Sequence, residues 1–214
     1  MPPKTKRLTK KEQQALVRRQ LLAQANNVVD FMVDYAAFAT YQMRDSDDAI
    51  CLRSLHAAAL TPTERADIER LFCDNMQTLY ENSSWGFDLE KKRVELFEDA
   101  ARYIVVERAS SPGHIEAFLH FRFLEDDGDV VVYVYEIQVG AGMQRQGLGK
   151  RLMQVLELIG RKHKMKFILL TVFKTNVHAM QFYTKTMGFD IDETSPSANG
   201  DDTESYEILS KPLV

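Results

Sequence analysis

The sequence predicts an α/β protein with a mixed central sheet, helices on both of its faces, and an N-terminal helical extension. The first observation is the order of periodicities along the chain, which runs helix, strands, helix, strand, helix, strand. The second is size, because 214 residues with 45% apolar content suffice for one large core. We therefore expect a basic arm and helix over residues 1–44 that pack on one main domain over residues 45–214.

The N-terminal region combines a helix signal with a strong positive charge. Thr9 and Glu12 have the spacing of a capping box, and apolar residues recur at helical intervals as far as Tyr35, which predicts one long amphipathic helix. Residues 1–19 carry a net charge of +6, so the rest of the chain carries about −10. The arm fits either a nuclear address or a solvated helix start, and the acidic body favours a basic peptide over nucleic acid as its ligand.

Between the arm and the middle of the chain, the pattern predicts one strand and two helices. A mixed apolar run at residues 49–56 fits the first strand. Thr61-Pro62-Thr63-Glu64 is typical of a helix start, and this helix should extend to about Tyr80. A loop that holds Trp85 follows, and then a charged helix over residues 89–97.

The second half of the chain supplies most of the predicted sheet. Turn residues at 125–129 predict a hairpin between two of its strands, and Gly188 is a candidate helix end. The predicted strands are residues 103–107, 117–123, 130–139, 167–172 and 206–209, and the predicted helices are residues 147–163 and 176–187.

Several classes of protein are excluded by what the sequence lacks. Cys51 and Cys73 stand without a CxxC or Cys/His spacing, so we expect reduced thiols and no metal site. No apolar run reaches the roughly 18 residues that a membrane span needs, and the basic start does not resemble a signal peptide. We therefore expect an intracellular protein that neither enters a membrane nor binds nucleic acid directly.

A glycine-containing loop carries the clearest functional signal. It comprises Gln144, Arg145, Gln146, Gly147, Leu148 and Gly149, and it joins a predicted strand to a predicted helix. Backbone amides at such a helix start can bind a pyrophosphate, and Arg145, Lys150 and Arg151 add positive charge. Neither a Rossmann nor a Walker motif fits, since each needs glycines at positions that Arg145 and Gln144 occupy. A helix cap without a ligand is the alternative.

This loop resembles the acetyl-CoA loop of the GNAT superfamily of N-acetyltransferases. Asn176, the run Ala179-Met180-Gln181-Phe182-Tyr183 and the pair Gly188-Phe189 resemble the second half of that fold. The resemblance covers residues 45–210 and implies that the strand before the loop splays from its parallel neighbour, which frees backbone groups for pantetheine. The implied acetyl-CoA contacts are Ile137, Gln138, Val139, Gln144, Arg145, Gln146, Gly147, Leu148, Gly149, Lys150, Asn176 and Thr194.

A closer resemblance links the remaining motifs to the NatD family of protein N-terminal acetyltransferases. The matching segments are residues 75–80, 85–86, 121–123, 133–136, 171–174 and 205–209. This resemblance implies acetylation of the α-amine of core histones of classes four and two-A, whose tails begin Ser-Gly-Arg-Gly. It also implies activity without an auxiliary subunit, in nucleus and cytoplasm. The implied peptide contacts are Tyr80, Trp85, Tyr133, Tyr135, Thr171 and Tyr206, with Glu125 and Asp126 for the substrate arginine.

Each of these peptide contacts has an alternative interpretation. Tyr133 and Tyr135 share one face of a strand and could be core residues, the acidic hairpin could be a solvated turn, and Trp85 could be a buried anchor. Leu124 stands where the family would suggest a further carboxylate. The Ser-Pro-Ser-Ala-Asn-Gly stretch within residues 194–204 could be a mobile loop or a substrate lid.

Acetyl transfer to an amine needs a proton acceptor, and Glu136 at the strand end is our candidate for it. An ordinary strand carboxylate paired with a cation is the alternative. Tyr183 occupies the position of a general acid in many superfamily members, although it could equally be a packing residue. Competing functions on the same fold are a lysine or small-amine acetyltransferase and a non-catalytic acyl-CoA-binding module.

Overall fold

The computed structural model describes residues 8–42 and 48–213, which form a mixed α/β fold around one eight-stranded sheet. The strand order is β1-β2-β3-β4-β5-β6-β8-β7, and only β5 and β6 pair in parallel among the described strands. The strands are β1 Thr40–Gln42, β2 Ala49–His56, β3 Arg102–Arg108, β4 Ala117–Asp126, β5 Asp129–Val139, β6 Phe167–Phe173, β7 Asp190–Ile191 and β8 Tyr206–Pro212.

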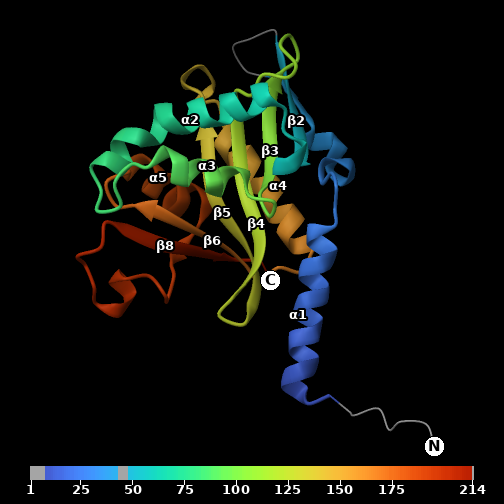
Figure 1. The fold of residues 1–214 in the computed structure, drawn as a ribbon, viewed down its shortest axis with the longest axis vertical. Coiled ribbons are helices and arrows are strands. Elements are labelled where there is room, and N and C mark those ends of the chain that lie inside the picture. The colour runs from blue at the N-terminus through green and yellow to red at the C-terminus, as the bar shows by residue number, and fades with distance from the viewer. Residues whose placement is uncertain (1–7, 43–47, 214) are drawn as a thin grey trace, which may run out of the picture.

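Helices cover both faces of this sheet, as the sequence predicts. Figure 1 shows α2 and α3 in front of the strands, α4 behind them, and α1 extending away from the body. The helices are α1 Lys10–Asn26, α2 Pro62–Glu81, α3 Leu89–Phe97, α4 Leu148–Lys162 and α5 Val177–Gln181, with the 3-10 segments η1 Met32–Phe38, η2 Ala57–Ala59, η3 Ala141–Met143 and η5 Ser197–Asn199, and the π-helical η4 Phe182–Met187.

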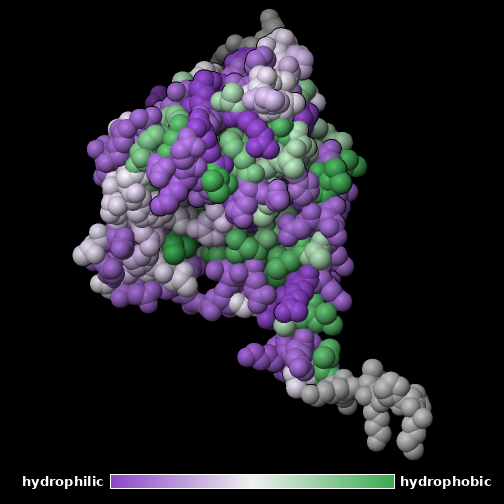
Figure 2. Space-filling model, viewed as in Figure 1, coloured by the Kyte–Doolittle hydropathy of each residue, from purple (hydrophilic) through white to green (hydrophobic). Residues whose placement is uncertain are grey.

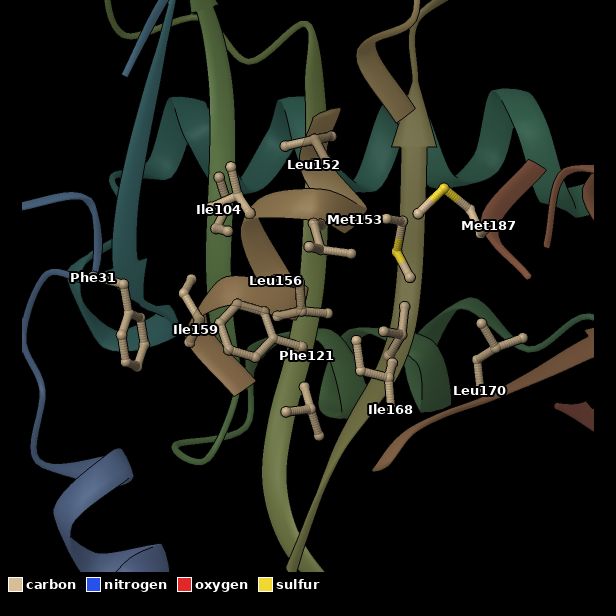
Figure 3. Close-up of a cluster of buried hydrophobic side chains, with 14 of the residues drawn as sticks. Phe31, Ile104, Phe121, Leu152, Met153, Leu156, Ile159, Ile168, Leu170 and Met187 are labelled. Carbon is tan, nitrogen blue, oxygen red and sulfur yellow. The ribbon is translucent and has the colours of Figure 1, made fainter. Parts of the chain in front are cut away.

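The larger hydrophobic core lies between the sheet and α4. Figure 3 shows Leu152, Met153, Leu156 and Ile159 of α4 facing the strands. Ala25, Phe31 and Met32 from the N-terminal region belong to the same buried cluster. The N-terminal region is therefore part of the main core, while the expected boundary at residues 44 and 45 lies outside the described residues.

One helix prediction is wrong in its length. The capping box of Thr9 and Glu12 forms, but α1 ends at Asn26 and does not continue to Tyr35. The buried guanidinium of Arg102 donates to the carbonyls of Asn26 (2.8 Å) and Val28, and these contacts turn the chain away from a helical path. The basic residues at positions 4, 6 and 7 lie outside the described residues.

The strand that carries Glu136 is irregular in two ways. β5 pairs with β6 only from Val131 to Val134, so the two parallel strands part beyond that point. A bulge in the β4–β5 pairing places Glu136 opposite His120 and Val134 opposite Phe121, with Tyr135 as the extra residue. Because a bulge resets strand alternation, Tyr135 and Glu136 both face α2 and α3.

Candidate active site

The parting of β5 and β6 opens a cavity of about 820 Å³. Its walls come from α2, β5, the loop before α4, β6, α5 and η4. In the space-filling view, the face toward the reader is hollowed over this part of the sheet (Figure 2). Sixteen predicted site residues line the cavity: Tyr80, Trp85, Tyr135, Glu136, Ile137, Gln138, Val139, Gln144, Arg145, Gly147, Leu148, Gly149, Lys150, Thr171, Asn176 and Tyr183.

The loop before α4 has the features of an anion site. Gly147 adopts a left-handed conformation (φ 82°) and leaves the first amides of α4 without a side-chain cap. A Cβ at Gly147 would meet no atom within 4 Å, so the space above this residue is open. Within residues 8–42 and 48–213, neither Arg145 nor Lys150 forms an ion pair, and both remain available for a phosphate.

Two expected members of this loop are engaged elsewhere. Arg151 donates to the carbonyls of Phe38 (3.1 Å) and Thr40 (3.2 Å), and its guanidinium lies over the ring of Tyr41. The Tyr41 hydroxyl donates to the carbonyl of Gln146 at 3.3 Å, and Gln146 does not line the cavity. Both residues therefore tie the loop to the N-terminal segment.

The free edge of β5 is only partly unpaired. The carbonyl of Val139 accepts hydrogen bonds from Asn75 (3.2 Å) and Gln144 (3.0 Å). This carbonyl is therefore already occupied, contrary to the expectation that it would be free for the cofactor. The side chain of Gln138 bonds to Asn75 and Glu136. Since β6 has turned away, the remaining backbone groups of residues 135–138 on this edge fit an extended amide-containing arm.

Glu136 lies at the junction of the cavity and the sheet, with 5% of its surface exposed. Its Oε1 is 2.5 Å from the Nζ of Lys92, and its Oε2 accepts from Gln138 at 2.7 Å. The pKa of the Glu136 carboxyl is raised, because burial is the largest influence on it, and the Lys92 ammonium and the Gln138 amide lower it only in part. Sequence analysis missed Lys92, because a lysine in a charged helix normally points to solvent.

Tyr183 faces the cavity from the π-helical turn η4 and is 7% exposed. Burial is the main cause that raises the pKa of its hydroxyl, and the nearby Glu136 carboxylate adds to the effect. Asn176 accepts from the amide of Ala179 (3.1 Å) as the cap of α5 and also lines the cavity. Gly149 packs beside Phe182, and a Cβ at this position would make ordinary van der Waals contact with that ring at 3.6 Å.

Aromatic side chains cluster in one part of the cavity lining, and Tyr206, which does not line the cavity itself, packs against this cluster. The ring centroid of Phe173 lies 5.0 Å from that of Tyr80 and 5.1 Å from that of Trp85, and the Trp85 and Tyr206 centroids are 5.1 Å apart. Trp85 is 49% exposed, which contradicts its interpretation as a buried anchor. Burial raises the pKa of Tyr80 to about 12, so its hydroxyl stays protonated.

The two acidic residues expected to recognise the substrate arginine lie in different surroundings. Glu125 pairs with Arg18 of α1 at 2.9 Å, whereas Asp126 lines a second hollow of about 250 Å³. Thr194, expected at the cofactor, lies in this hollow and not in the main cavity. Asp127 and Asp129 of the same hairpin also line this hollow, and sequence analysis did not connect them with its two further carboxylates, Asp192 and Glu193.

The acidic hollow adjoins the main cavity on the same face of the sheet. Val131 alternates with the core residues Val130 and Val132, so it faces the side of Tyr133. Tyr133 does not line the main cavity, but its hydroxyl is hydrogen bonded to Thr171, and its ring centroid lies 5.1 Å from that of Tyr135. The Tyr133–Thr171 pair therefore stands between the two hollows.

The segment after β7 is anchored by a buried carboxylate. Glu207 accepts hydrogen bonds from Ser195 and Ser197, both at 2.6 Å, and lies 3.3 Å from the Nζ of Lys174. These bonds fix the first part of the stretch that sequence analysis left open between a loop and a lid.

Comparison with known proteins decides the family. The model of the acetyltransferase (GNAT) family matches residues 65–189, which is more than half of the chain. The chain belongs to the GNAT acetyltransferase family. Acetyl-CoA is accordingly the cosubstrate of its acetyl transfer, and the cavity offers a fitting set of groups in the uncapped start of α4, Arg145, Lys150 and the free edge of β5.

Solved structures share the fold at low sequence identity. The NatC complex bound to Gag peptide and CoA gives a TM-score of 0.55 at 16% identity, over 77% of this chain and 99% of that chain. The ribosomal-protein-S18-alanine N-acetyltransferase from Escherichia coli gives 0.51 at 18%, over 77% and 94%. Arabidopsis thaliana NAA60 in complex with a bisubstrate analogue gives 0.52 at 14%, over 75% and 95%. Beyond the family, these likenesses concern the fold alone.

Two findings concern metals and membranes. Among the residues that the structure describes, no group of three or more His, Cys, Asp or Glu side chains is arranged to hold a metal ion. Within the same residues, no helix combines the length and apolar character that crossing a bilayer requires.

Proposed function

We propose that this acetyltransferase modifies the α-amine at the N-terminus of a protein, and that its substrates are core histone tails that begin Ser-Gly-Arg-Gly. The observation that carries the proposal is the aromatic cluster of Tyr80, Trp85, Phe173 and Tyr206. An internal lysine would require a trough in which the peptide continues in both directions. An aromatic wall on one side of the cavity instead favours a chain that enters with its terminus first.

The acidic hollow supports a basic residue near that terminus. Burial and the neighbouring carboxylates of Asp192 and Asp127 raise the pKa of Asp126, so a cation would relieve this crowding. An arginine two residues beyond the reacting amine lies about 7 Å along an extended peptide, before its own side chain is counted. The hollow begins three residues from Val134, a distance of about 10 Å along β5.

The proposed chemistry uses two side chains of the cavity. Acetyl-CoA supplies the thioester carbonyl carbon that the amine attacks. Glu136 accepts a proton from the substrate ammonium, directly or through one water, and the amine nitrogen then forms the new C–N bond as the C–S bond breaks. Tyr183 donates a proton to the departing sulfur and regains the second proton, which the nitrogen loses as the amide forms. The products are the acetylated amine and the free CoA thiol, and the proton on Glu136 leaves to solvent. An α-amine has a pKa near 8 against about 10.4 for lysine, so its deprotonation costs roughly 3 kcal/mol less.

The proposal includes action without an auxiliary subunit, in nucleus and cytoplasm. Action without an auxiliary subunit is supported by the N-terminal segment, because its residues Ala25, Phe31 and Met32 are already buried within the chain itself. The basic peptide is the proposed partner, while neither nucleic acid nor membrane is part of the proposal.

Three synthetic peptides test this function by the thiol that acetyl transfer releases. One begins Ser-Gly-Arg-Gly and contains a later lysine, the second has its first residue replaced by Ala, and the third has its α-amine blocked. We expect rapid release with the first, slower release with the second and none with the third. Release from the blocked peptide would establish lysine acetylation, and no release from any amine would favour a binding module.

A further inference from the structure

A buried lysine behind the cavity is the strongest unassigned feature of the described residues. Lys92 lies on α3, and its side chain is 8% exposed. Its ammonium contacts Glu136 and Glu95, lies 3.3 Å from the hydroxyl of Tyr80, and stands 4.8 Å from the ring centroid of Phe72. Lys92 does not line the cavity, so it can act on a substrate only through its neighbours.

Fold stability and side-chain packing are two alternative explanations for the contact between Lys92 and Glu136. A buried ion pair can stabilise the fold, but the cost of removing both charges from water offsets most or all of their attraction. Packing alone would be served as well by an apolar side chain of similar length. The position of Lys92 matters because one of its partners is the proposed base and another, Tyr80, belongs to the aromatic cluster.

We propose that Lys92 is a positioning residue that keeps Glu136 ionised and oriented for proton acceptance. Its ammonium fixes Oε1 while Gln138 fixes Oε2, and Asn75 in turn holds Gln138 through a 2.9 Å hydrogen bond. The network runs from α3 across β5 to α2, so the carboxylate is held from both sides. This inference rests on the proposed role of Glu136.

The charges around Glu136 give the expected direction of each substitution. Burial raises the pKa of Glu136 and the Lys92 ammonium lowers it, whereas Glu95 raises it. Tyr80, Tyr103 and Tyr183 also face this carboxylate, and His120 lies opposite it on β4. Burial raises the pKa of each hydroxyl and lowers the pKa of the imidazole, so all four groups stay neutral. A K92M substitution should therefore raise the pKa of Glu136, and E95Q should lower it.

A titration without substrate tests this inference apart from the proposed function. The carboxyl carbon of Glu136 is followed by NMR against pH in the full chain, with E136Q used to assign its signal. We expect the midpoint to move to higher pH in K92M, to lower pH in E95Q, and to stay near the parent value in K92R. An unmoved midpoint in K92M would overturn the proposal, whatever the enzyme acetylates. If K92M does not fold, K92Q and the opposite shift in E95Q carry the same test.

Kinetics supply the second readout. In K92M the acid limb of kcat/KM should move to higher pH, and a shift of one pH unit lowers kcat/KM about tenfold at pH values well below that limb. K92R should keep the limb in place. Because Lys92 acts through Glu136, adding K92M to E136Q should cause no further loss of turnover per folded molecule. An equal loss at every pH would mean that Lys92 is purely structural.

Discussion

The two faces of the central sheet bury different kinds of side chain. Along β4, Leu119, Phe121 and Phe123 join the apolar core under α4, whereas the alternating His120 and Arg122 face α2 and α3. From Ala117 to Phe123 the α4 face of this strand carries only apolar residues, and the opposite face continues into Glu136 and its polar network. Strand alternation thus gives one face an apolar core, while the other face combines a second apolar cluster, which includes Phe118, with charges that are paired within a buried network.

The largest expected effect is on the apolar face. Replacing Leu156 by Ala removes a fully buried side chain from the core of Figure 3 and should lower the free energy of unfolding by about 2–5 kcal/mol. Urea denaturation measures this loss, with Leu158→Ala on the exposed side of α4 as the matched control. If Leu156→Ala also lowered turnover per folded molecule severalfold, the two faces would not be functionally distinct.

The next effect concerns the polar face. Replacing Glu136 by Gln removes the proposed proton acceptor and should reduce turnover by roughly a hundredfold or more, with acetyl-CoA affinity nearly unchanged. Glu107→Gln is the matched control, because Glu107 is also 5% exposed and paired with Arg53 but lies outside the cavity. Turnover near the parent value in E136Q would exclude Glu136 as the base.

The smallest effect concerns the acidic hollow. Replacing the peptide arginine by Ala should remove about 1.5 to 3 kcal/mol of binding free energy, since a carboxylate–guanidinium bond is charge assisted. In an Asp126→Asn enzyme the same peptide change should cost clearly less. The four enzyme and peptide combinations, measured at two salt concentrations, separate recognition from general attraction. Simply additive losses would show that Asp126 does not read the peptide.

Local rules predicted much of this fold. The caps of α1 and α2, the start of α4, and the end of η4 at Gly188 follow from residues within a few positions of each other. The sixteen cavity residues lie on strand ends, loops and helix ends whose order the family resemblance supplied. The two-residue strand β7 and the three-residue strand β1 were missed because such short segments carry no periodicity.

What could not be predicted depends on contacts between distant parts of the chain. The end of α1 depends on Arg102, which is 76 residues away from Asn26. The pairing of Lys92 with Glu136 requires both the bulge at Tyr135 and the docking of α3, and neither leaves a mark in the local sequence. Thr194 was placed at the cofactor by analogy, but its segment bends toward the acidic hollow, where Asp192 accepts its hydroxyl at 2.6 Å.

The hydrogen bonds that join the N-terminal segment to Arg151 and Gln146 determine which fragments of the enzyme would keep the cofactor loop in place. The family match spans residues 65–189, yet Phe38, Thr40 and Tyr41, which hold these two residues, precede it. A fragment limited to residues 65–189 would keep both glycines of the loop but lose the N-terminal residues that hydrogen bond to it. The residues that hold this loop in place therefore extend beyond the stretch that the family model matches.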